Sequence, residues 1–86
     1  MKYKVFYHPR SKNFLKKIAK TDFDDLLKKL ALLERNPFDK SLDIKKLAVK
    51  GDFYRMRYRK IRVIYQVEKM KKIVYVFEID FRGNVY

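Results

Sequence analysis

The stretch GDFYRMRYRKIRVIYQVE, residues 51–68, gives the clearest indication of how this chain folds. Aromatic or apolar residues alternate with arginines over residues 53–59, and a mainly apolar run with one arginine follows at residues 61–68. Such runs of β-branched and aromatic residues are typical of strands, and only Lys60 separates the two. The stretch therefore predicts two antiparallel strands, Phe53–Arg59 and Ile61–Glu68, joined by a very tight turn.

A further strand is expected on the C-terminal side of this hairpin. The polar turn Lys69–Lys72 leads into the apolar run Ile73–Phe81, which completes a three-stranded meander. On the N-terminal side, Gly51-Asp52 is a turn signal. Before it, Phe38–Lys50 reads as a long connection without secondary structure, tethered to the core by its apolar residues.

The N-terminal half predicts one strand and two helices. Residues Lys2–His8 alternate as a strand does. Pro9 is tolerated in the first turn of a helix, and we expect a short helix over Ser11–Lys20. Thr21 is a good N-cap for a second helix, which should end at Asn36-Pro37.

The resulting order βααβββ predicts an α+β fold, an antiparallel-rich sheet with a helix hairpin packed on one face. The length of 86 residues predicts a single domain over residues 1–86. The second helix carries apolar residues at helical spacing, and the strands carry them in alternation. We expect the following side chains to be largely buried between helices and sheet: Phe23, Leu26, Leu27, Leu30, Tyr54, Val63, Tyr65, Val74 and Val76.

The composition constrains the partners. The net charge is +13, spread over both halves of the chain, so a polyanion is expected to bind: nucleic acid, the ribosome or an acidic protein. Simple solubility or a lysine-rich proteome is the alternative. The chain has no cysteine, which excludes disulfides and thiolate metal sites and is compatible with the cytoplasm. No apolar run is long enough to span a membrane.

Arginines mark the candidate site. Because side chains alternate along a strand, Arg55, Arg57 and Arg59 are expected to share one face. A solvated sheet surface would explain three such cations without function. Adding Arg62 and Arg82 favours an anion site, since an arginine inside the apolar run at residues 61–65 carries a desolvation cost unless it meets an anion or acid.

Other chemistry has little support in the sequence. Glu78 and Asp80 lie two apart on one strand, and we interpret them as salt-bridge partners of Arg55, Arg57 or Arg62. The single histidine, His8, precedes Pro9 and is interpreted as a surface or capping residue. There is no glycine-rich phosphate loop, nucleophile elbow or histidine-rich spacing. We therefore expect no cofactor and no protein-bound metal.

Taken together, these segments resemble the RelE-like toxins of the RelE/ParE superfamily. In that family a K-L pair precedes a strand with the pattern Y-(K/R)-x-(K/R), an R-(V/L)-(I/V)-Y-x-V strand follows, and an arginine stands a few residues before a tyrosine at the end. The matching residues are Lys46-Leu47, Gly51-Asp52-Phe53-Tyr54-Arg55-Met56-Arg57, Arg62-Val63-Ile64-Tyr65-Gln66-Val67 and Phe81-Arg82-Gly83-Asn84-Val85-Tyr86. The resemblance covers essentially the whole chain and agrees with the predicted order of elements.

The resemblance implies a type II toxin that cleaves mRNA in the ribosomal A site, where a 2′-OH attacks the adjacent phosphate. It assigns the catalytic positions to Arg55, Arg57, Arg62, Arg82 and Tyr86, and Arg59, Lys46 and Lys50 are expected to bind RNA. Where arginines stand at the paired positions of the family, they stabilise charge, because arginine does not readily release a proton. The general base is left open among Tyr86, Glu78, Asp80 and a lysine such as Lys46.

The family also implies partners and alternatives. The expected partner is an acidic, RelB-like antitoxin that can form a heterotetramer with the toxin, and the ribosome with its mRNA is the expected target. A ParE-like toxin that poisons a topoisomerase without cutting RNA is the first alternative, because the two kinds of toxin share the fold. An inactive relative that only binds RNA is the second.

Overall fold

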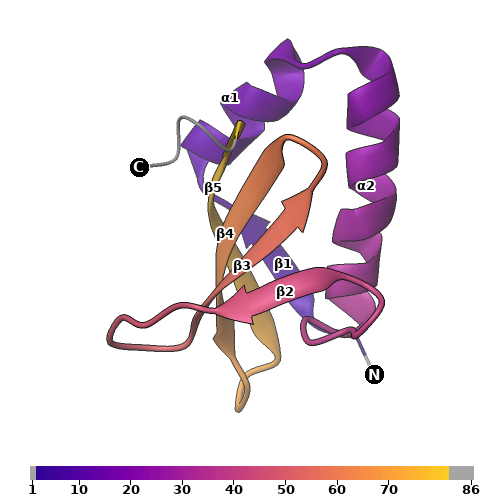
Figure 1. The fold of residues 1–86 in the computed structure, drawn as a ribbon. Helices are drawn as coiled ribbons and strands as arrows, with labels where there is room; N and C mark the ends of the chain where they lie inside the picture. Colours follow the sequence, from indigo (N-terminus) through magenta and orange to yellow (C-terminus); the bar gives the residue numbers. More distant parts are fainter. Residues whose placement is uncertain (1, 82–86) are drawn as a thin grey trace.

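The computed structural model describes residues 2–81, which form five strands and two helices (Figure 1). In chain order these are β1 (Lys4–Tyr7), α1 (Pro9–Lys17), α2 (Lys20–Arg35), β2 (Asp43–Lys46), β3 (Phe53–Tyr58), β4 (Ile61–Glu68) and β5 (Ile73–Phe81). The strands form one sheet in the order β1-β5-β4-β3-β2, in which only β1 and β5 are parallel. The expected α+β fold with an antiparallel-rich sheet and two helices is therefore confirmed.

Strand β2 was not expected from the sequence. It pairs with β3 from Asp43 opposite Arg57 to Lys46 opposite Tyr54, within the segment interpreted as an irregular connection. Three of its four residues are charged, which hides the apolar alternation that would mark a strand. Charged side chains are common on a short edge strand, because they discourage pairing with another chain.

The helix boundaries differ from those expected for both helices: α1 spans Pro9–Lys17 where Ser11–Lys20 was expected, and Lys20 is the first residue of α2. Helix α1 begins at Pro9, with His8 as its N-cap. Helix α2 begins at Lys20 with Ala19 as its N-cap, so the prediction that Thr21 caps it was wrong. Ala19 is the last residue with extended backbone, and Thr21 therefore lies within the first turn. Asp22 in that turn complements the positive helix N-terminus.

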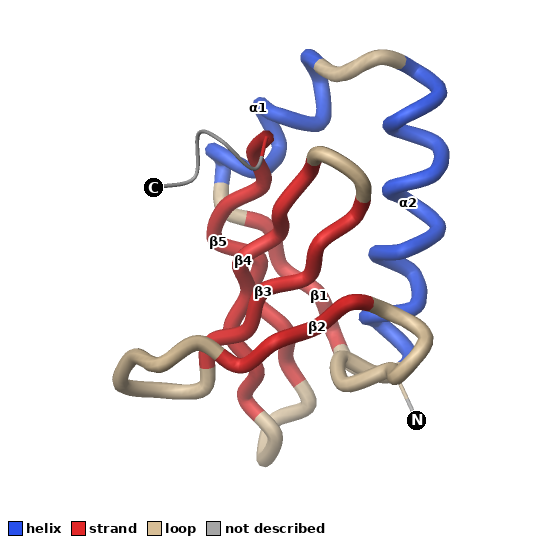
Figure 2. Tube along the Cα trace, viewed as in Figure 1, coloured by secondary structure: helices blue, strands red, loops and turns tan. Residues whose placement is uncertain are grey.

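The core lies between α2 and one face of the sheet, with α2 beside the sheet and α1 above it in Figure 2. Leu26, Leu30 and Leu33 face it from the helix. The sheet contributes Tyr54, Met56, Ile61, Val63, Tyr65, Val67, Val74, Val76 and Ile79. The expected burial is confirmed except for Leu27, which is 42% exposed, and Phe23, which is half-buried.

The error at Leu27 has a geometric cause. Positions 26, 30 and 33 follow the i, i+4, i+7 spacing of one narrow helix face, whereas position 27 is turned about 100° away from position 26. Leu33, which was not among the expected core residues, takes the third place in the stripe and is 1% exposed.

Leu30 and Leu27 provide a matched stability test. Leu30→Ala removes a side chain that is 3% exposed and should lower the free energy of unfolding by about 2–5 kcal/mol. Leu27→Ala makes the same chemical change on the exposed side of the helix and should cost about 1 kcal/mol or less. Urea denaturation followed by circular dichroism measures both. Equal losses would show that α2 does not present the 26-30-33 stripe to the sheet.

One buried tyrosine joins the sheet to the segment that follows α2. Tyr65 is buried in the core and donates its hydroxyl hydrogen to the carbonyl oxygen of Pro37 at 2.7 Å, which fixes the segment that follows α2. Burial raises the pKa of the Tyr65 hydroxyl far above its usual range, so this tyrosine stays neutral.

Neither helix in the described part of the chain is long and apolar enough to cross a membrane.

Candidate functional site

The face of the sheet turned away from α2, here called the open face, carries the arginines. Burial alternates along β3 and β4, and Arg55, Arg57 and Arg62 occupy the half-buried positions that point away from the core. Arg57 pairs in register with Arg62, which pairs with Asp80, while Asp43 of β2 lies opposite Arg57. We call this line across four strands, Asp43, Arg57, Arg62 and Asp80, the arginine row.

Two cations directly opposite each other repel, so the row needs negative charge. Asp43 supplies some at one end, where Arg57 Nε donates to its carboxylate at 3.0 Å. This contact uses the Nε edge of the guanidinium and leaves the two terminal amino groups available for an anion. Asp43 was not among the expected site residues, because the strand that carries it was missed.

Arg55 lies two residues before Arg57 on the same strand and face. Its Nε is buried, and within the described part of the chain it has no hydrogen-bond partner. A buried, charged donor without a partner is costly unless a ligand satisfies it. Arg55 and Arg57 therefore present guanidinium donors to the open face that the described residues satisfy only in part.

Arg59 does not share this face, so the prediction of three aligned arginines was wrong for its third member. Strand β3 ends at Tyr58, and Arg59 adopts a positive φ of 54° in the tight turn before β4. Its guanidinium carbon lies 5.4 Å from the centre of the Tyr58 ring, and its Nη2 lies 3.9 Å from Asp25 of α2. The turn thus directs Arg59 toward the helix side of the sheet.

A β-bulge places the two carboxylates of β5 on the open face. The register between β4 and β5 shifts after Ile64, which pairs with Glu78, whereas Tyr65 pairs with Val76. Phe77 is the extra residue, and the shift keeps Ile79 buried while Glu78 and Asp80 point outward. Glu78 and Asp80 were expected to share a face, and they do.

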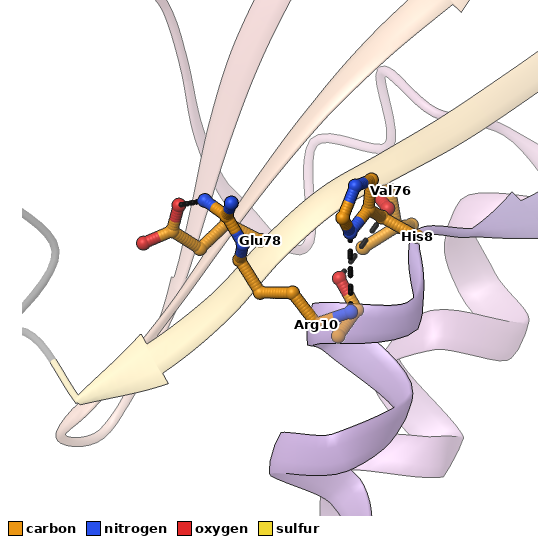
Figure 3. Close-up of polar contacts among 5 residues, drawn as sticks. His8, Arg10, Val76 and Glu78 are labelled. Atoms are coloured by element: carbon orange, nitrogen blue, oxygen red, sulfur yellow. Dashed lines mark hydrogen bonds and ion pairs between the residues drawn. The ribbon is translucent and has the colours of Figure 1, made fainter.

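The partner of Glu78 differs from the one expected. Glu78 forms an ion pair with Arg10 of α1 at 3.1 Å, not with an arginine of β3 or β4 (Figure 3). Asp80 accepts a hydrogen bond from the backbone N–H of Phe81 at 2.8 Å through one carboxylate oxygen. Helix α1 reaches Glu78 because it packs along β5, and an open cleft of about 420 Å³ lies between them. Arg10 was missed because it lies 68 residues away in the sequence.

His8 has the capping role that was expected. Its Nδ1 accepts a hydrogen bond from the backbone N–H of Arg10 at 3.1 Å and satisfies the first turn of α1 (Figure 3). Nearby, the hydroxyl of Ser11 donates to the carbonyl oxygen of Val76 at 3.3 Å. These contacts attach the start of α1 to β5 and thereby position Arg10 beside Glu78.

The remaining predicted residues are dispersed. Lys46 pairs in register with buried Tyr54, so it points toward the helix side of the sheet, and its ammonium lies 3.8 Å from Asp52. Lys50 is exposed in the loop after β2. Arg82 and Tyr86 lie outside the described residues. Within residues 2–81, no group of three or more His, Asp or Glu side chains could hold a metal ion.

Comparison with known families identifies the fold and the kind of protein. A family model described as the ParE toxin of type II toxin–antitoxin systems, parDE, matches residues 5–86. The chain belongs to this family, within the RelE/ParE toxin superfamily. A search of curated protein sequences found no match.

Solved structures agree. The toxin is similar to a chain of the archaeal RelE–RelB complex from Pyrococcus horikoshii, with 28% identity, a TM-score of 0.85 and coverage of 99% of this chain and 100% of the other. It is similar to the isolated Escherichia coli RelE toxin, with 26% identity, a TM-score of 0.77 and coverage of 92% and 83%. A chain of the Methanococcus jannaschii RelB–RelE complex shares the fold, with 17% identity and a TM-score of 0.79; the match covers 95% of this chain and 95% of the other.

Proposed function

We propose that this toxin is a ribosome-dependent endoribonuclease that cleaves mRNA in the A site. The observation that carries the proposal is the arginine row together with Arg55, whose buried Nε has no partner among the described residues. The family's reaction places three oxygens with growing negative charge on one phosphorus, and preorganised guanidinium groups stabilise such charge. The 28% and 26% identity to RelE chains supports this assignment.

Each residue then has a role. Arg55, Arg57, Arg62 and Arg82 bind and stabilise the phosphate, and none of them acts as base. Glu78 is engaged by Arg10, and Lys46 points to the helix side, so neither suits proton transfer at the arginine row. Asp80 lies opposite Arg62 and keeps one carboxylate oxygen clear of its backbone contact. We therefore favour Asp80 or Tyr86 as the group that takes the proton from the 2′-OH, while the bond between phosphorus and the 5′-oxygen breaks and the leaving 5′-oxygen takes a proton from an acid or from water.

The experiment that tests this function is primer extension on mRNA from cells in which the toxin is induced. New 5′ ends should accumulate inside translated codons within minutes, and they should be absent from the same transcript with its start codon removed. Translation should stop before replication. Intact messages in arrested cells would contradict the nuclease assignment.

A second candidate function follows from the family model, whose description names the ParE toxin. A toxin of that kind would block a DNA topoisomerase and leave mRNA intact, with replication stopping first. The two functions share the fold, so the fold does not decide between them. The arginine row favours the nuclease, because poisoning a topoisomerase does not require a site for a reacting phosphate.

We also propose an acidic, RelB-like antitoxin as the physiological partner, acting in the cytoplasm. Similar structures from three organisms are RelB–RelE complexes. A charge of +13 on 86 residues would attract an acidic chain over long distance and raise its association rate. The antitoxin would cover the arginines while bound, and a toxin–antitoxin heterotetramer is the proposed assembly.

A further inference from the structure

A second line of side chains crosses the open face at the other end of the strands. Phe53 pairs in register with Gln66, Gln66 pairs with Tyr75, and Tyr75 pairs with Phe6, so the line spans β3, β4, β5 and β1. The bulge residue Phe77 joins it, with its ring centre 5.3 Å from that of Phe53 and 4.5 Å from that of Tyr75. We call these five residues the aromatic row.

This row is apolar surface on a face that no described helix covers. Helix α2 packs on the opposite face, and α1 lies along the upper part of β5 (Figure 1). The three clustered rings are half-buried by one another, and Phe6 is 45% exposed. Mutual packing accounts for their contacts with each other, but a contiguous solvent-facing aromatic patch on a highly charged protein is typical of a binding surface.

The polar groups around the row indicate what binds there. The ammonium of Lys4 lies 5.9 Å from the centre of the Phe6 ring, and Lys45 pairs in register with Arg55 beside the row. Within the described chain, the Gln66 amide makes no hydrogen bond, and it stands between Phe53 and Tyr75. Aromatic rings combined with cations are the features by which proteins hold single-stranded nucleic acid, and a free amide can bond to a base edge.

The distance to the arginine row fits the same ligand. Arg62 and Gln66 are four residues apart on β4 and lie on one face, which separates the two rows by about 13 Å. A strand of RNA whose reacting phosphate lies on the arginines therefore places its neighbouring nucleotides over the aromatic rings. An apolar protein segment would match the rings alone, not the cations on both sides.

We propose that the aromatic row is a stacking platform for nucleobases next to the phosphate held by the arginine row, with Gln66 contacting a base edge. This inference rests on the proposed function and deepens it, because it names the part of the RNA that the toxin recognises besides the phosphate. The bases bind by stacking, so the platform tolerates different sequences and Gln66 adds a preference among them.

The test is a double-mutant cycle: one base is removed from the RNA, one aromatic ring is removed from the toxin, and binding is measured for each change alone and for both together. The probes are fluorescein-labelled RNA heptamers that are 2′-O-methylated throughout, so that no 2′-OH can attack, with or without one abasic nucleotide. For the wild-type toxin, an abasic nucleotide at one or two positions should weaken binding about 5- to 100-fold in fluorescence anisotropy. Phe77→Leu should weaken binding of the complete heptamer by a similar factor and should be insensitive to the abasic nucleotide at the same position.

A matched control is available on the other face. Phe81 is 43% exposed, pairs in register with buried Ile61 and contacts Phe14 of α1. Phe81→Leu should therefore leave heptamer binding and its sensitivity to base removal unchanged. Thermal unfolding checks that each variant is folded, and Tyr75→Leu replaces Phe77→Leu if the latter is not.

The outcomes separate this inference from the proposed function. If Phe77→Leu and Tyr75→Leu bind complete and abasic heptamers with the wild-type ratio, or if the wild type does not sense the missing base, the platform does not exist. If Phe77→Leu and Tyr75→Leu bind RNA as the wild type does but no longer bind the acidic antitoxin, the row binds a protein and the inference is overturned. Primer extension with the wild type decides the function independently. If the rings and the bases depend on each other for binding but no mRNA is cleaved, the platform stands and the nuclease function is wrong. If mRNA is cleaved but the rings and the bases do not depend on each other, the nuclease function stands and the platform is wrong.

Discussion

Arg62→Ala should reduce ribosome-dependent cleavage by about 10²–10³-fold while the toxin folds normally. Arg62 lies in the middle of the arginine row, on the central strand β4, between Arg57 and Asp80. The residue is half-buried and its Nε is buried, which restricts the side chain, so its charge is in place before the phosphate acquires negative charge. Binding to the ribosome should change little, because the many other cations contribute most of that attraction.

The matched control for Arg62→Ala removes one positive charge from the opposite end of β4. Lys71 is exposed in the turn between β4 and β5, and Lys71→Ala should cleave at the wild-type rate. Single-turnover cleavage on programmed ribosomes, with toxin in excess, measures both variants. Full activity of Arg62→Ala would remove this residue from the site, and full activity of an Arg62/Arg82 double alanine variant would refute phosphate stabilisation by this face.

The sequence predicts those parts of the fold that depend on neighbouring residues. Strands β3, β4 and β5 carry their alternation openly, and Pro9 marks the start of α1. Strand β2 is hidden because its charged residues are stabilised by pairing with β3, which no local pattern reveals. The same limit applies to the start of α2: the backbone is extended at Ile18 and Ala19, and the helix begins at Lys20 in spite of the capping preference of Thr21.

For the site, alternation places Arg55 and Arg57 on one face, and register with β4 adds Arg62. The partners of these arginines depend on contacts distant in sequence: Asp43 reaches Arg57 through the missed strand, and Arg10 takes Glu78 from across the chain. The bulge at Phe77 has no signature in the sequence, yet it turns both carboxylates outward. A bulge is fixed by packing on the two faces of the sheet, so only the folded structure shows it.

The free toxin should cleave naked RNA about 10⁵-fold more slowly than mRNA in the A site. The described open face offers charge stabilisation through its arginines but no histidine, since the Nδ1 of His8 is engaged in capping α1. Holding the strand on the arginine row and the aromatic row does not by itself bring the 2′-oxygen in line with the phosphorus and the leaving oxygen. Alignment of reacting groups contributes roughly 7–11 kcal/mol in well-oriented systems, and the ribosome would supply it by holding the codon in an extended conformation.

The measurement compares the same labelled message, free and bound to programmed ribosomes, at saturating toxin. A 2′-O-methyl group at the cleaved nucleotide is the matched control and should abolish cleavage in both settings, because it removes the attacking hydroxyl. The 3′ end of the upstream product should be a cyclic phosphate or its hydrolysis product. Equal rates on free and ribosome-bound RNA would mean that the arginine row and its neighbours align the substrate unaided, and the dependence on the ribosome would then be wrong.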